Sequence, residues 1–302
     1  MDLNTLFESR NLSDNTLKLY KRNLLKLNND EVIKNLNFLK NEAVILDKIK
    51  SYAKTTQRSY IISICSILKN IDKFKKQYDN YFKHLKTMNS DLKVNTTKTE
   101  TQKDNWLSTE AIDKIYTELK DEVNLFSTKK KLTKPQFSKL QDLLLMSLYT
   151  CIQPRRNRDY FLMKIVQQSD DYSDDDFNYL ILNKKEPVMM KLNKYKTDKK
   201  YKSIDIELPI ELKDVIKLYL KYYPSTEDDK FLLLNNKLKQ MKNNNDITLQ
   251  LNKIFQNKVS SSMLRNIFLS NKYSKVINDL KTDTTAMGTS VSTALDNYIK
   301  SD

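Results

Sequence analysis

The chain has 302 residues, which is enough for roughly two domains with a sizeable core. Its single histidine, two cysteines and single glycine argue against a zinc site and exclude a glycine-rich phosphate loop of the Walker type. The formal net charge of +15 points to a polyanionic partner, with nucleic acid as the first hypothesis; lysine enrichment from an AT-rich genome is the alternative source of this charge.

The two cysteines and the hydropathy indicate a compartment. Cys65 and Cys151 both lie in apolar helical patterns, which is typical of buried free thiols in a reducing environment. No apolar run approaches the length of a membrane span, and the N-terminus lacks the apolar segment of a signal peptide. We therefore expect an intracellular protein that does not associate with membranes.

The first part of the chain carries apolar residues at the spacing of amphipathic helices, with lysine and arginine on the other faces. Helices are expected over 13–28, over about 31–53, from Thr55 or Thr56 onward, and over about 73–92. Together they predict a compact, all-helical domain over residues 1–92.

Residues 93–105 are polar and almost free of apolar side chains, which predicts an exposed linker. A second domain over 106–302 follows this linker. In it we expect a capped helix over about 108–119, a lysine-rich loop over 121–134, and a strongly apolar helix over about 135–150.

The apolar helix is followed by the sequence P-R-R-N-R-D-Y, in which Pro154 breaks the helix. Three arginines and Asp159 stand at this break, between apolar residues on both sides. Arginines in such surroundings are expected to be partly buried, and a buried arginine needs an anion or another partner. We interpret the segment as an anion site at a loop-to-helix junction, and the alternative is a basic cluster on the surface.

Alternating apolar residues then predict a small antiparallel β-sheet within a mainly α-helical fold. Its three strands are expected at 177–182, 187–192 and 203–208. The second turn between them, N-K-Y-K-T-D-K-K-Y-K, is a basic hairpin tip. Further helical structure is expected over 210–223 and 230–256, with the asparagine run 243–245 as a loop.

Near the C-terminus, a serine among Ser260, Ser261 and Ser262 caps a helix whose apolar face begins at Met263. Arg265 lies inside this helix, three residues after Ser262, so the two side chains share a face. The only glycine, Gly288, follows, and we expect it to occupy a turn with φ > 0 or a helix C-cap. Tyr298 comes ten residues later.

The second domain thus combines an arginine at a helix break, a lysine on a β-turn, an arginine on a helix and a late tyrosine. This set is suited to metal-free attack on a phosphodiester. Two guanidinium groups can bind the non-bridging oxygens and stabilise the five-coordinate phosphorus. Tyrosine is a competent nucleophile, and lysine can donate a proton to the leaving 5′-oxygen. Neither a metal nor a nucleotide cofactor is needed.

These segments, in this order, resemble the motifs of the tyrosine recombinase (phage-type integrase) superfamily. P-R-R-N-R-D-Y resembles the first arginine box, in which an acidic residue follows the catalytic arginine by three positions; this selects Arg156, paired with Asp159. N-K-Y-K-T resembles the turn with the catalytic lysine and selects Lys196. S-M-L-R-N-I-F resembles the H-x-x-R helix and gives Arg265, and M-G-T-S-V-S-T-A-L-D-N-Y resembles the L-G-H-S…Y box and gives Tyr298.

The resemblance implies a helical core-binding domain that clamps DNA and an α+β catalytic domain with the DNA breaking-rejoining fold. It implies that Tyr298 forms a 3′-phosphotyrosyl bond, that Arg156 and Arg265 hold the phosphate, and that Lys196 protonates the leaving group. The implied partners are double-stranded DNA and further copies of the chain, as a homo-tetramer on DNA, with no small-molecule cofactor. The sequences of the last two motifs are most similar to those of integrases of large eukaryotic DNA viruses, virophages and related mobile elements. This leaves the host nucleus, the viral factory and the virion open as locations.

Two positions depart from the family pattern. Ser262 stands where H-x-x-R has histidine, and Thr289 stands where histidine or tryptophan usually follows the glycine. Their hydroxyls can still contact a phosphate as auxiliary residues, but they are poor general bases. Three readings follow: a recombinase or integrase with reduced or differently tuned activity, a type IB topoisomerase-like nicking-closing enzyme, and a catalytically silent DNA-binding relative.

Overall fold

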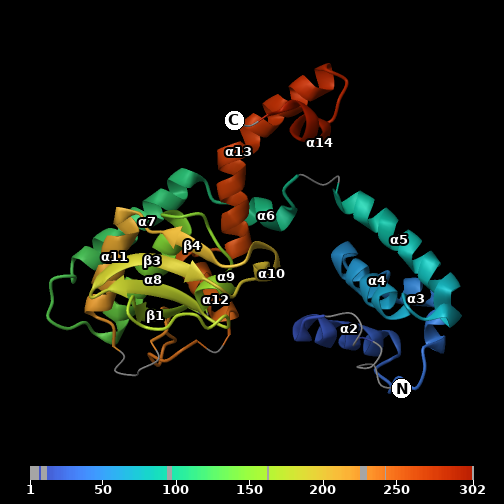
Figure 1. Cartoon of the computed structure of the whole chain (residues 1–302), viewed down its shortest axis with the longest axis horizontal. Coiled ribbons are helices and arrows are strands. Elements are labelled where there is room, and N and C mark those ends of the chain that lie inside the picture. Colours follow the sequence, from blue (N-terminus) through green and yellow to red (C-terminus); the bar gives the residue numbers. More distant parts are fainter. Residues whose placement is uncertain are drawn as a thin grey trace. The chain divides into compact units, whose positions relative to one another are not determined.

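The chain folds into two compact units, Met1–Thr97 and Lys98–Asp302, and it is mainly helical with one small sheet (Figure 1). The boundary between the units falls inside the polar segment 93–105. The computed structural model describes residues 7, 12–93, 97–161, 163–224, 230–241 and 243–300.

The smaller unit is entirely helical in its described part. Its elements are α2 (Asp14–Leu27), η1 (Asn37–Lys40), α3 (Glu42–Ile49), α4 (Lys54–Leu68), η2 (Asp72–Phe74) and α5 (Lys75–Lys93). Apolar residues of all six elements contribute to its core, and α4 contributes the most. The buried Asn23 of α2 donates to the hydroxyls of Ser59 and Ser63 on α4, which fixes how the two helices pack.

The single helix predicted over about 31–53 is wrong. Residues 31–36 are irregular, the short η1 follows, and α3 begins only at Glu42. The physical reason lies in the polar residues of this stretch. Asn29 and Asp30 adopt positive φ angles of 58° and 62°, and the Asn41 side chain accepts a hydrogen bond from the Val44 amide and caps α3.

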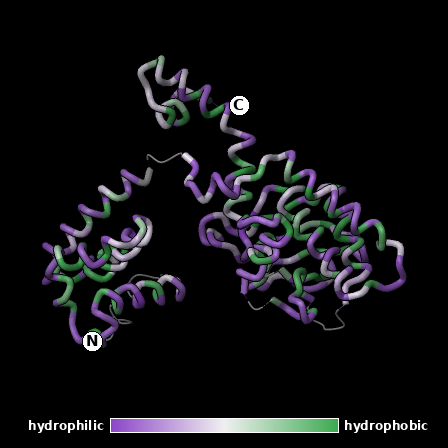
Figure 2. The backbone as a smooth tube through the Cα atoms, turned by 180° about the vertical axis from the view of Figure 1, so that it is seen from behind, coloured by the Kyte–Doolittle hydropathy of each residue, from purple (hydrophilic) through white to green (hydrophobic). Residues whose placement is uncertain are grey.

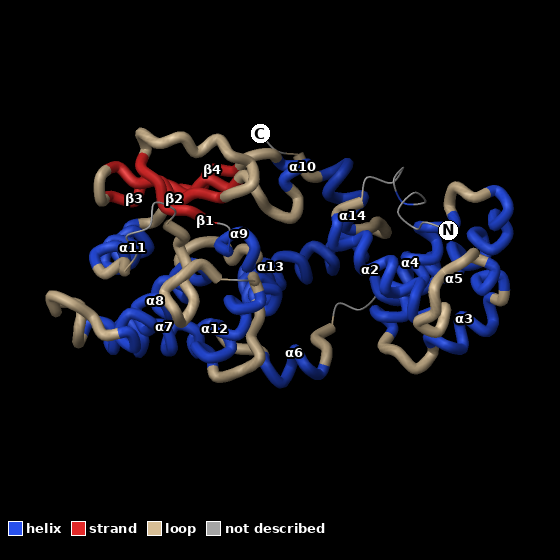
Figure 3. The backbone as a smooth tube through the Cα atoms, turned by 90° about the horizontal axis from the view of Figure 1, so that it is seen from below, coloured by secondary structure: helices blue, strands red, loops and turns tan. Residues whose placement is uncertain are grey.

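The larger unit is built around α8 (Lys134–Thr150), which is buried on nearly every side from Leu140 to Tyr149. Helices α7, α8 and α12 lie on the same side of the sheet (Figure 3). The surrounding helices are α7 (Thr109–Asn124), α11 (Ile210–Lys221) and α12 (Asn245–Phe255). The apolar run from Leu143 to Leu145 therefore forms the centre of the hydrophobic core.

Part of the predicted linker is helical. Helix α6 spans Glu100–Asn105, because Thr99 and Gln102 form a reciprocal capping box at its start. Its last residue, Asn105, is buried and accepts a hydrogen bond from the Lys258 amide at 2.9 Å, which ties α6 to the larger unit.

The sheet has four strands in the order β1-β2-β3-β4. They are β1 (Met163–Gln167), β2 (Asn178–Asn183), β3 (Glu186–Leu192) and β4 (Ile204–Glu207). The pairs β2–β3 and β3–β4 are antiparallel, but β1 pairs with β2 in parallel, so the sheet is mixed and the prediction of an antiparallel sheet is corrected. Strand β1 was not expected from the sequence.

The helix predicted from residue 230 begins later, at Asn245 with α12. The described residues from 230 to 241 are irregular and carry two isolated β-bridges. Side chains hold this segment in place: the buried Gln141 of α8 bonds both the amide and the carbonyl of Leu234, and Tyr219 donates to the carbonyl of Leu232. These long-range bonds replace the backbone bonds that a helix would make.

The C-terminal part begins with α13, which runs unbroken for 26 residues from Ser261 to Ala286. Gly288 then has a φ of 70°, and the amides of Gly288 and Thr289 donate back to Thr285 and Thr284 in a Schellman-type cap. The expectation of a C-capping glycine is confirmed. The short α14 (Val291–Thr293) and a π-helical turn, η3 (Ala294–Tyr298), follow. Within the described residues no helix is long and apolar enough to cross a membrane.

Candidate active site

The arginine segment forms a tightly held loop between α8 and α9 (Asn157–Phe161). Tyr149 at the end of α8 donates to Oδ1 of Asn157 at 2.8 Å, and Nδ2 of Asn157 donates to the hydroxyl of Thr248 on α12 at 2.8 Å. Tyr160, which is fully buried, donates to the carbonyl of Leu148 at 2.7 Å. These bonds fix the loop, and Arg156 lies half-buried within it.

Arg156 and Arg265 are brought close together, although 109 positions separate them in the chain. The pKa of Arg265 is lowered, first by burial and then by the like charge of Arg156, while Asp159 and Tyr149 oppose this. The buried Nε of Arg265 has no hydrogen-bond partner among the described residues. Two guanidinium groups therefore share a partly desolvated site whose positive charge is not fully compensated by the protein.

The box spacing suggested an ion pair between Asp159 and Arg156, but Asp159 pairs with a different arginine. Its Oδ2 pairs with Nε of Arg155 at 2.9 Å, and Arg156 contributes its backbone amide and its charge. Burial raises the pKa of Asp159, and Arg155 is the first group that opposes this rise. The carboxylate is 1% exposed, and its Oδ1 has no partner among the described residues. Arg156 thus stays available beside Arg265.

The turn that carries Lys196 lies next to this loop. The buried Asn178 at the start of β2 donates to the carbonyl of Asp159 at 2.8 Å and to that of Lys194 at 2.9 Å, and it accepts from the Lys194 amide at 2.7 Å. The guanidinium carbon of Arg155 stands 5.5 Å from the ring centre of Tyr195. Lys196 follows Tyr195 with an exposed side chain, so the backbone turn that carries the predicted lysine is joined to the arginine loop through Asn178 and Tyr195.

At the start of α13 the hydroxyl that acts as N-cap is Ser260, which accepts from the Met263 amide at 3.2 Å. Ser262 is exposed in the first turn, whereas Ser261 is buried. Burial raises the pKa of the Tyr149 phenol, and the Ser261 hydroxyl is among the groups that oppose this rise. Sequence reasoning missed Tyr149 and Ser261. The spacing of four between Ser261 and Arg265, which places them on one helix face, was a signal for the second of them.

Thr289 and Tyr298 lie away from this group. From Arg265 to Ala286 the helix advances 21 residues, and at about 1.5 Å per residue this is about 32 Å along its axis. Thr289 is half-buried in the turn at the far end of α13, and Tyr298 is 61% exposed on the segment after this turn, which runs back alongside α13 (Figure 1). The six predicted residues thus form two groups, with Arg156, Lys196, Ser262 and Arg265 in the first.

The far half of α13 is solvated. Every residue from 271 to 279 is exposed, and hydrophobic residues recur among hydrophilic ones along this part of the chain (Figure 2). Leu269, Tyr273, Val276 and Ile277 are large apolar side chains that follow one another at helical spacing. One face of α13 therefore carries an exposed apolar stripe between the two groups of candidate residues.

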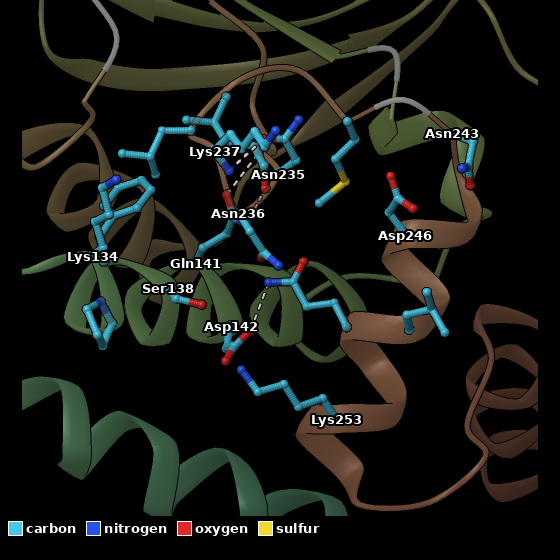
Figure 4. Close-up of a pocket in the computed structure, with 17 residues that line it drawn as sticks. Lys134, Ser138, Gln141, Asp142, Asn235, Asn236, Lys237, Asn243, Asp246 and Lys253 are labelled. Carbon is cyan, nitrogen blue, oxygen red and sulfur yellow. Dashed lines mark hydrogen bonds between the residues drawn. The ribbon is translucent and has the colours of Figure 1, made fainter.

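A further cavity lies elsewhere in the larger unit. About 740 Å³ in volume, it lies between α8, the segment after Leu234 and α12, and it is lined mostly by polar side chains (Figure 4). Gln250 donates to Oδ1 of the buried Asp142 at 2.8 Å, and burial raises the pKa of that carboxyl. None of the six predicted site residues lines this cavity.

The described side chains include no group of three or more His, Cys, Asp or Glu that is arranged to hold a metal ion. The only histidine, His84, belongs to the smaller unit, where its Nε2 lies 2.6 Å from Glu42. The first group of residues can therefore bind an oxyanion and donate a proton through Lys196, and it contains no imidazole. No protein-family model, curated protein or solved structure matches the chain.

Proposed function

We propose that the chain is a tyrosine recombinase that cleaves and rejoins double-stranded DNA through a 3′-phosphotyrosyl intermediate. The observation that carries the proposal is the pair Arg156 and Arg265, whose charges are close together and incompletely compensated. A scissile phosphate relieves this repulsion, because its non-bridging oxygens accept hydrogen bonds from both guanidinium groups. Ser262 in the first turn of α13 adds a hydroxyl, and the helix N-terminus adds its partial positive charge.

The chemistry needs neither metal nor nucleotide. The Tyr298 oxygen attacks phosphorus and loses its proton to solvent, the bond from phosphorus to the 5′-oxygen breaks, and Lys196 donates a proton to that oxygen. Attack by a 5′-hydroxyl on the phosphotyrosyl bond reverses the step and releases the tyrosine. Because Ser262 and Thr289 replace imidazoles, we expect cleavage to be about 10²–10⁴-fold slower than with a positioned base.

The location of Tyr298 decides how the site is assembled. The phenol stands on the segment beyond a continuous helix that leads away from Arg265, so we propose that each tyrosine serves the arginines of a neighbouring protomer on DNA. The exposed apolar stripe of Leu269, Tyr273, Val276 and Ile277 supports this, because a protomer interface buries such a face. The same feature weighs against a monomeric topoisomerase-like enzyme, which must bring its own tyrosine to its own arginines.

The proposal is tested with a nicked suicide DNA substrate that carries the element's terminal sequence, in buffer with EDTA. We expect a covalent protein–DNA band on a denaturing gel. Tyr298→Phe removes the band, whereas the matched control Tyr52→Phe, an exposed tyrosine between α3 and α4, retains it. Arg156→Lys lowers the yield, whereas Arg158→Lys, exposed in the same box, leaves it near the wild-type level.

A second candidate function is that of a catalytically silent DNA-binding protein. It is favoured by Ser262 and Thr289 in place of histidines and by the separation of Tyr298 from the arginines. It predicts DNA affinity that falls with increasing salt, as the first candidate also does. Intact DNA binding on cognate sequences with no covalent band, under conditions where protomers assemble, would favour this function over the recombinase.

A further inference from the structure

Arg155, the first arginine of the box, is held on two sides by buried partners. Its Nε pairs with Asp159 at 2.9 Å, and its guanidinium carbon lies 5.5 Å from the centre of the Tyr195 ring. Asp159 and Tyr195 are 1% and 3% exposed. The Nε–H of Arg155 and its position over the Tyr195 ring are therefore used within the protein, and Arg155 connects the arginine loop to the residue that immediately precedes Lys196.

The turn itself is closed by further bonds. Asn178 links the backbone of Asp159 to both the amide and the carbonyl of Lys194. The hydroxyl of Tyr195 donates to the carbonyl of Lys202 at 2.6 Å, which joins the two ends of the segment that contains Lys196. The backbone around Lys196 is thus attached to the arginine loop through Asn178 and through the ring of Tyr195.

We infer that Arg155 is a positioning residue for Lys196, and that it does not bind the phosphate itself. The inference rests on the proposed function, because it concerns the proton that Lys196 delivers. A lysine has a flexible stem, so its ammonium reaches the leaving oxygen only when its backbone is correctly placed. Arg155 supplies this placement because it contacts both Asp159 and the Tyr195 ring, and it thereby holds the turn with Lys196 next to the arginine loop.

Arginine suits this role because its Nε–H pairs with the carboxylate while its guanidinium carbon stays over the Tyr195 ring, and a lysine side chain has no Nε–H. Arg155→Lys keeps the positive charge near DNA and removes both contacts. Tyr195→Leu removes the ring but keeps the turn length, and Tyr195→Phe keeps the ring and removes only the bond to Lys202. These three variants separate the stacking contact from the charge and from the hydroxyl.

The test compares two DNA substrates that differ in one atom, with either oxygen or sulfur at the 5′-bridging position of the scissile phosphate. A 5′-thiolate leaves without being protonated, so cleavage of the sulfur substrate does not need Lys196. We expect Arg155→Lys to cleave the oxygen substrate about 10- to 100-fold more slowly than wild type, and the sulfur substrate at nearly the wild-type rate. Lys196→Ala gives the same pattern, whereas Arg156→Lys is slow on both.

The paired variants provide the control for folding. Tyr195→Leu is expected to follow Arg155→Lys, and Tyr195→Phe, which keeps the ring, to slow cleavage of the oxygen substrate less than Tyr195→Leu does. Melting temperature and DNA affinity are measured for each variant; if Arg155→Lys does not fold, the comparison of Tyr195→Leu with Tyr195→Phe decides.

Two results with an active wild type overturn the inference. Slow cleavage of both substrates by Arg155→Lys assigns Arg155 to phosphate binding, and wild-type cleavage of the oxygen substrate shows that the placement is not needed. Wild-type protein that forms no adduct with either substrate refutes the proposed function instead, and the inference falls with it, because no leaving group then needs a proton.

Discussion

If Tyr298 serves a neighbouring protomer, two inactive variants must restore activity when they are mixed. Tyr298→Phe retains the arginine pair and lacks the nucleophile, and Arg265→Lys retains the nucleophile and lacks one guanidinium of the pair. In the chain, Arg265 stands near the start of α13 and Tyr298 on the segment after its end, and the helix between Arg265 and Ala286 spans about 32 Å. A single protomer of either kind therefore contains no complete site.

The size of the expected effect follows from random assembly of the two variants in equal amounts. A working site needs its arginines from the Tyr298→Phe protomer and its tyrosine from the Arg265→Lys protomer, so about one quarter of the sites are complete in a closed head-to-tail assembly. We therefore expect the mixture to give about one quarter of the wild-type covalent adduct. Each variant alone should give none, or only the residual amount that Arg265→Lys supports.

The assay uses the suicide substrate and gives the two variants tags of different length, so that the denaturing gel reports which chain is linked to DNA. The adduct must carry the tag of Arg265→Lys. A mixture that yields no adduct, while wild type yields one under the same conditions, means that each tyrosine serves its own arginines. That result would refute the assembly derived from α13 and would require Tyr298 to reach the arginines of its own chain.

Three further predictions concern the proton chemistry and the core. Ser262→His supplies an imidazole next to the arginine pair, so we expect it to raise the rate of adduct formation above wild type by as much as about 10²-fold. The yield of adduct over time measures this rate. An unchanged rate would mean that proton transfer from the tyrosine does not limit cleavage. Burial raises the pKa of Asp142, so the folded state holds this proton to higher pH than the unfolded state, and the stability is lost as the pH rises through the folded-state pKa. Asp142→Asn, which can still accept from Gln250, should therefore raise the melting temperature relative to wild type at pH 7 and leave it nearly equal at pH 3; no difference at pH 7 would contradict the buried placement of the carboxyl. Burial raises the pKa of Cys65 to about 12, so at pH 8 a thiol reagent should modify the less buried Cys151 first and Cys65 only on unfolding, as followed by mass spectrometry.

The sequence was sufficient for the features that depend on local chemistry. Pro154 ends α8 where expected, because it cannot continue the helix and the arginines after it form a loop. Gly288 ends α13 with a positive φ, because a residue without Cβ adopts it at no cost. Helices with clear apolar periodicity, such as α2 and α8, were also found with nearly correct ends.

Features that depend on distant contacts were missed. The irregular course from 230 to 241 follows from Gln141, which lies 93 positions from Leu234 and bonds its backbone, and an apolar run alone does not reveal such a partner. The sequence likewise did not reveal whether Asp159 pairs with Arg155 or with Arg156. The arginines precede Asp159 by four and three positions, both spacings that allow a contact, so only the loop geometry determines which side chain reaches it.

The separation of Tyr298 from the other candidate residues bears on how DNA cleavage is regulated. Arg156, Lys196 and Arg265 stand on the folded body of the larger unit, where buried tyrosines and Asn178 hold them whether or not DNA is present. Tyr298 stands exposed on the short segment after α13, outside this body. Under the proposed function, one bound protomer thus holds a phosphate without cutting it, and cleavage begins only when a second protomer occupies the neighbouring site. The rate of adduct formation should then rise more steeply with protein concentration than DNA occupancy does, since binding requires one protomer and chemistry requires two.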